Sequence, residues 1–197
     1  MKPIMRICLL GLSIVSLSAC SILPKAPAVN TYQLPPSNVT VRVNSQPLSL
    51  MVATPYANRY LNHQRLVVVK DNHEVQSYAG MRWDDELPTV FRDRLIDDLR
   101  RSQAYRTVVN DKEAVLTDHE LRTDLLAYQL QFMQNQPFVV ISVDANLFNA
   151  KNSSVISSKR FSVNAPIKSA ELKEIVPALA HLNDQINTQI IQWLASQ

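Results

Sequence analysis

The sequence predicts a single α+β domain: a mixed, largely antiparallel sheet with two main amphipathic helices packed on it. The first observation is a set of segments that alternate apolar and polar residues, clearest over 141–147 and 155–163. The second is a pair of segments, beginning near Leu87 and at Ser169, in which apolar residues recur every three or four positions. The chain has 197 residues, which is enough for one domain with its own core.

The start of the chain has the layout of a secretory signal. Lys2 and Arg6 precede an apolar run over 7–17, and the run ends at Ser18-Ala19-Cys20. A spanning helix needs about 20 apolar residues, and this run is well short of that. We therefore expect residues 1–19 to be a cleaved signal peptide.

The cysteine at the end of this signal resembles the lipobox of bacterial lipoproteins. In those proteins the thiol is diacylated and the cysteine becomes the new N-terminus, which makes Cys20 the predicted lipidation site. Two alternatives stay open: an ordinary cleaved signal with a chance cysteine, and an uncleaved membrane anchor. Ser21 stands where enteric-type sorting uses an aspartate for inner-membrane retention, so the resemblance implies the periplasmic face of the outer membrane.

The first part of the predicted mature chain is a tether. Residues 20–36 carry four prolines and little charge, which favours an extended linker, with a first short strand over 32–34. Residues 37–197 form the predicted domain. Without Lys2 and Arg6 the chain holds 18 basic and 17 acidic residues, a net charge of +1, and no basic stripe that would bind nucleic acid.

The predicted domain begins with short strands. Valines at 39, 41 and 43 alternate with polar residues, and Leu48 to Ala53 gives an apolar run. The β-branched run over 66–69 predicts a buried strand. Turn-forming residues over 71–73 then lead to a hairpin partner over 74–78.

The first amphipathic helix is predicted from about Leu87 to Arg101. Asp84 or Asp85 is the expected N-cap, and Pro88 falls in the first turn, where its missing N–H costs little. One apolar stripe runs along this helix, formed by Leu87, Val90, Phe91, Leu95 and Leu99.

Three further strands and a second helix complete the domain. Strands are expected over 105–109 and 121–132, and the alternating segments 141–147 and 155–163 form a hairpin. The final helix has apolar residues at spacings of three and four, and Pro177 predicts a kink or a separate first turn in it.

The sequence carries no catalytic, cofactor or metal motif. Gly80 is the one glycine of the predicted mature chain, so glycine-rich phosphate loops cannot be built. The four histidines lack the close ligand spacing of a zinc site. We expect no enzymatic activity, no cofactor and no metal.

Four residues are candidate partner or junction contacts. Arg82 and Trp83 lie just before the first helix, where a tryptophan ring can fill the junction between sheet and helix. Tyr56 and Tyr60 fall in a polar loop, and exposed aromatic side chains are enriched at interfaces.

The order of these features resembles the ABC-type transport auxiliary lipoprotein family, which includes the PqiC-like lipoproteins. The resemblance begins at the lipobox and Tyr32-Gln33-Leu34 and includes Leu66 to Val69 and the segment from Tyr78 to Trp83. Near the C-terminus it rests on Ser158-Lys159-Arg160-Phe161, Pro166 and Ile191-Gln192-Trp193-Leu194.

The resemblance implies a role in intermembrane lipid transport. Its members work beside MCE-domain proteins and inner-membrane transport components that move phospholipid or other hydrophobic molecules. The implied partners are therefore the outer membrane, an MCE-domain protein and phospholipid, with homo-oligomerisation left open. A lipid-binding carrier and a cell-envelope assembly lipoprotein unrelated to transport are the alternatives.

Overall fold

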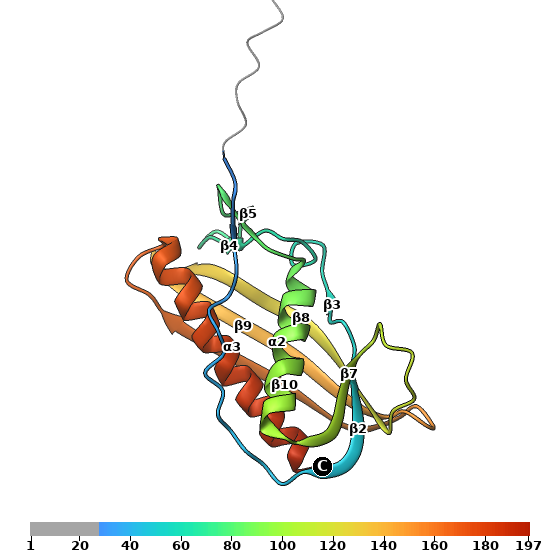
Figure 1. Cartoon of the computed structure of the whole chain (residues 1–197). Helices are drawn as coiled ribbons and strands as arrows, with labels where there is room; N and C mark the ends of the chain where they lie inside the picture. The colour runs from blue at the N-terminus through green and yellow to red at the C-terminus, as the bar shows by residue number, and fades with distance from the viewer. Residues whose placement is uncertain (1–27) are drawn as a thin grey trace, which may run out of the picture.

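The computed structural model describes residues 28–197, which form an eight-stranded sheet with both helices on the same face and a second, two-stranded sheet (Figure 1). The predicted α+β class, with its mixed sheet and two helices, is confirmed. In chain order the elements are β1 (Asn30–Tyr32), β2 (Gln46–Val52), β3 (Tyr56–Ala57), β4 (Val67–Val69), β5 (Val75–Ser77), β6 (Met81–Trp83), α2 (Leu87–Ser102), β7 (Tyr105–Asn110), β8 (His119–Met133), β9 (Gln136–Asn149), β10 (Ser154–Pro166) and α3 (Leu172–Ala195).

The long strand β8 organises the sheet. On one side it pairs antiparallel with β9, which in turn pairs antiparallel with β10. On the other side three short strands pair with it in succession, all parallel: β2 at Leu121, β3 at Asp124 and β4 at Leu130. The longest ladders are thus antiparallel, and the short strands that precede α2 add the parallel part of the sheet.

The core lies between the sheet and the helices. Alternate residues of β9 are buried, as the period-two pattern predicts, and the intervening ones lie on the face without helices. On that open face the Arg160 guanidinium binds the Asp144 carboxylate at 2.6 Å. The inward residues of β9 are Val139, Ile141, Val143, Ala145 and Leu147.

Residues 33–45 form a strap over the helices, and the strand predicted at Val39 to Val43 is wrong. The alternation of burial is present, with Val39 buried, but the segment belongs to no strand. Figure 1 shows it running along the helical side of the domain, away from any free sheet edge, before it enters β2. Arg94 donates to the Pro35 carbonyl at 2.6 Å, and the Asn38 N–H donates to Asp184 at 3.1 Å. The valines therefore pack on helices instead of joining a ladder.

The helix ends differ from the prediction in two ways. The N-cap of α2 is Glu86, without a side-chain cap bond, so the cap predicted at Asp84 or Asp85 is wrong. The Asp85 carboxylate accepts from the Glu86 N–H instead, at 2.6 Å. The α3 helix runs from Leu172 through Pro177 as one element, so of the two predicted alternatives the separate first turn is wrong.

An acid-sensitive contact joins β2 to the start of β8. The Ser49 N–H and hydroxyl donate to Asp118 at 3.0 and 2.9 Å, and these bonds, with Lys151, hold the pKa of Asp118 at about 2. Because this pKa is below the ordinary value, the contact stabilises the fold above about pH 4 and is lost as the pH falls toward 2. We expect Asp118→Asn to lower stability at neutral pH, with the difference from wild type shrinking between pH 4 and pH 2.

Urea unfolding from pH 2 to 7 measures this difference. Asp84→Asn is the matched control, because Asp84 is exposed and its carboxylate has no hydrogen bond within residues 28–197. A gap between wild type and Asp118→Asn that stays constant across the acid range would contradict the linkage.

Candidate functional site

The described chain begins beside β6. The Asn30 N–H donates to the Gly80 carbonyl at 2.9 Å, and β1 then runs parallel to β6 with Thr31 opposite Arg82. Gly80 has a φ of +71°, which suits glycine in the turn before β6. We call the end of the domain that holds β1, β6 and the β4–β5 hairpin the tether end; it lies at the top of Figure 1.

Strand β6 separates the two adjacent candidate residues Arg82 and Trp83. Because neighbouring side chains of a strand point to opposite sides, Arg82 is exposed and Trp83 is completely buried. The Arg82 Nε donates to the Thr31 hydroxyl at 3.0 Å. The Trp83 ring packs edge-on against Tyr128, with 6.2 Å between the ring centroids. Arg82 is therefore a surface residue, whereas Trp83 fills the junction of sheet and helix.

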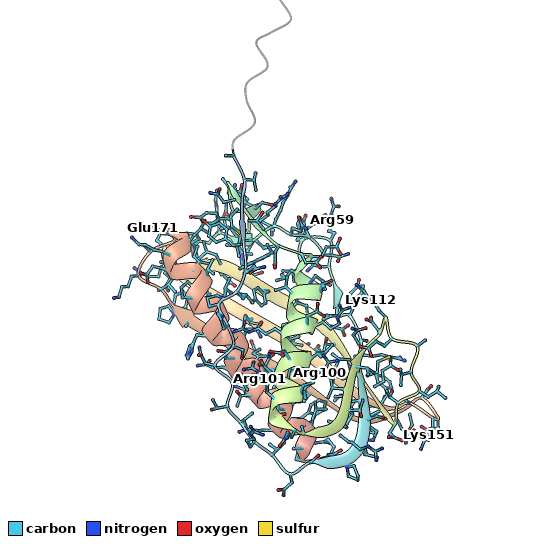
Figure 2. The ribbon with its side chains drawn as sticks, viewed as in Figure 1. Arg59, Arg100, Arg101, Lys112, Lys151 and Glu171 are labelled. Carbon is cyan, nitrogen blue, oxygen red and sulfur yellow. The ribbon has the colours of Figure 1, made fainter. Side chains whose placement is uncertain are left out.

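The two candidate tyrosines are exposed. Tyr56 is 73% exposed and Tyr60 is 52% exposed. The expected loop contains the short strand β3, which sets Tyr56 opposite Asp124 of β8. The Arg59 guanidinium, labelled in Figure 2, lies 5.5 Å from the Tyr60 ring centroid. Tyr56 and Arg82 lie on different strands that do not pair, so the sequence candidates do not form one compact site.

A cavity of about 600 Å³ opens at the tether end. The residues that line it include His63, Arg65, Arg82 and Glu86, with Val29 at its wall. Within residues 28–197 neither arginine of this lining forms a salt bridge. Arg82 can be singled out from the sequence by its place before the helix, whereas Arg65 has no such signal, because the loop before β4 and the strand β6 meet only in the fold.

Buried charges on α2 are a second feature that sequence reasoning missed. Arg92 is 2% exposed and binds Asp93 and Asp111 at 2.8 and 3.0 Å. Asp98 is fully buried, where it pairs with Arg101 and accepts from the Asn187 amide at 2.6 Å. A single apolar stripe does not predict these pairs. They arise because α3 covers α2 at Asp98, and the segments that follow β2 and β7 cover it at Arg92.

Cys20 lies outside the described residues. From residue 28 onward, no helix is long and apolar enough to cross a membrane. In the same part of the chain, no group of three or more His, Cys, Asp or Glu side chains is arranged to hold a metal ion.

Solved structures share this fold. Protein XCC0632 from Xanthomonas campestris superposes with a TM-score of 0.79 at 21% identity, over 85% of this chain and 95% of that one. The hypothetical protein CT253 from Chlamydia trachomatis gives 0.55 at 9% identity, over 77% and 100% of the two chains. A PelC dodecamer from Paraburkholderia phytofirmans gives 0.50 at 10% identity, over 84% and 95%. A comparison with curated proteins finds no match.

The mixed sheet with two helices on one face is thus the fold that this domain shares with the solved structures. The family model for the ABC-type transport auxiliary lipoprotein component matches residues 32–191. The chain therefore belongs to this family, as the order of its sequence features predicts.

Proposed function

We propose that this protein is an outer-membrane-anchored, non-enzymatic accessory component of an MCE and ABC-type intermembrane lipid transport system. The observation that carries the proposal is the family match, which spans nearly the whole described domain. Cys20 provides the anchor and places the domain in the periplasm. The domain then docks an MCE-domain protein that is connected to the inner-membrane components.

The exposed tyrosines support a docking role for the domain. Tyr56 is 73% exposed. Four residues along the same segment, the Tyr60 ring lies 5.5 Å from the Arg59 guanidinium. Aromatic and arginine side chains are enriched at protein interfaces, and aromatic rings in particular bury a large area at small entropic cost. We propose the segment over 56–60 as the protein-facing surface.

Crosslinking in intact native cells tests the docking role. We expect an amine-reactive crosslinker to couple the full-length lipoprotein to an MCE-domain protein, identified by mass spectrometry after purification from membranes. A photo-reactive residue at Tyr56 or Tyr60 should give the same adduct, whereas one at Ser162, on the open face of the sheet, should not. If neither chemistry recovers an MCE-domain protein, the proposed function is wrong.

The oligomeric state of the lipoprotein is a separate question within the proposed function. PelC, which shares the fold, is a dodecamer. Light scattering on the purified lipoprotein in detergent would report whether this chain also assembles.

A further inference from the structure

The cavity at the tether end carries an excess of positive charge. The residues that line it include Arg65, Arg82 and His63, all three of them exposed. Glu86 supplies the one carboxylate of the lining. The balance of fixed charge in this concave surface is therefore positive, and it attracts an anion.

The two guanidinium groups are available to a ligand. Arg82 uses its Nε on the Thr31 hydroxyl, which orients the group and leaves both terminal nitrogens without a partner in the described chain. Arg65 is exposed and donates no side-chain hydrogen bond within residues 28–197. Several arginines of the domain bind carboxylates instead, as Arg160 does with Asp144. A guanidinium presents parallel N–H groups that match the oxygens of a phosphate.

The cavity lies where the tether enters the domain. Val29 is part of its wall and is 53% exposed, which gives the opening an apolar side. Ala28 lies eight residue positions after Cys20, a length of chain that spans at most about 28 Å when fully extended. The fourteen residues of β9 alone extend about 45 Å. With Cys20 as the lipid anchor, this length keeps the cavity near the anchoring membrane, whereas the opposite end of the domain is not limited in this way.

We propose that this cavity binds the phosphate of a phospholipid head group in the anchoring membrane. The inference rests on the proposed function, because it takes Cys20 to be the lipid anchor. Arg65 and Arg82 hold the phosphate oxygens, and Val29 contacts the glycerol end of the lipid. The lipoprotein would thus contact a phospholipid at the membrane surface while its outer surfaces dock a protein.

Titration of the full-length lipoprotein in a maltoside detergent tests the site. The probes are dihexanoyl phosphatidylglycerol below its micelle concentration and inorganic phosphate, and the readout is the ¹⁵N resonances of the arginine Nε–H groups. We expect saturable shifts at Arg82 and Arg65 with the phospholipid. Arg65→Gln and Arg82→Gln should each weaken binding about fivefold, since each removes one basic charge near the phosphate.

Two further variants sharpen the result. Glu86→Gln removes the opposing carboxylate and should tighten binding, whereas Arg106→Gln removes an exposed arginine of β7 outside the cavity and should leave binding unchanged. A double variant of Arg65 and Arg82 that binds as wild type would overturn the proposal. So would inorganic phosphate binding as tightly as the phospholipid, because the cavity would then be a site for free phosphate.

The outcome is separable from that of the proposed function. If the phospholipid fails to bind while crosslinking still recovers the MCE-domain protein, the head-group site is wrong and the docking role stands. If the phospholipid binds and no MCE-domain protein is recovered, the head-group site stands and the docking role is wrong.

Discussion

Replacing Cys20 with serine should abolish membrane anchoring and function while leaving the domain folded. Each buried methylene of an acyl chain contributes about 0.8 kcal/mol, so removal of several chains eliminates stable attachment. The fold should survive because the core lies between β8, β9 and the two helices, all of them far along the chain from residue 20. Fractionation, thermal unfolding and transfer of radiolabelled phospholipid between the membranes of a deletion strain measure the three effects.

The anchor experiment needs controls that separate secretion from lipidation. An ordinary cleavable signal placed before Ser21 should release a soluble, folded periplasmic domain that does not restore transport. Ser21→Asp keeps the lipid but directs the protein toward inner-membrane retention. It therefore tests whether transport requires the outer-membrane location or only the lipid anchor. If the soluble domain restores transport in full, the anchor is dispensable and an adaptor fixed to the outer membrane is ruled out.

The sequence predicts long elements better than the segments between them. The hairpin of β9 with β10 and the apolar stripe of α2 were predicted correctly, because one face of each element packs on the core and the other does not, which gives a regular apolar spacing in the sequence. For the strap, the same alternation led to a wrong prediction of a strand. Its valines alternate as in a strand, but the surface they meet consists of helices, and no sequence pattern shows which partner an extended segment packs against.

The candidate site is predictable from the sequence only in part. The family and the lipidation motif follow from features that are contiguous in the chain. The cavity does not, because the parallel pairing of β1 with β6 brings residue 29 beside residue 81, some fifty positions away. Likewise, Arg82 is exposed and Trp83 is buried because both lie in one strand, where neighbouring side chains point to opposite sides. A strand of three residues is too short for this alternation to be recognised in the sequence.

Trp83→Ala should lower the free energy of unfolding by about 3–5 kcal/mol, the usual cost of truncating a large aromatic side chain in a core. The ring is fully buried and packs edge-on against Tyr128, which is also buried, so its removal leaves a void between β6 and β8. Folded domains have only about 5–15 kcal/mol of stability, and such a loss would leave much of the protein unfolded at growth temperature. Urea unfolding followed by circular dichroism measures the change.

Two neighbouring substitutions show whether Trp83 acts through the core or through a partner. Trp83→Phe should cost less than the alanine variant, because it retains an aromatic ring and removes an indole N–H that has no hydrogen-bond partner in the described chain. Arg82→Ala, one residue away on the exposed side of β6, should change stability by less than about 0.5 kcal/mol. If Trp83→Ala instead unfolds like wild type but loses the crosslink to the MCE-domain protein, Trp83 is a docking residue. If the Trp83 variants lose stability and Arg82→Ala does not, the Trp83 side of β6 stabilises the core, and the Arg82 side is free to line the cavity.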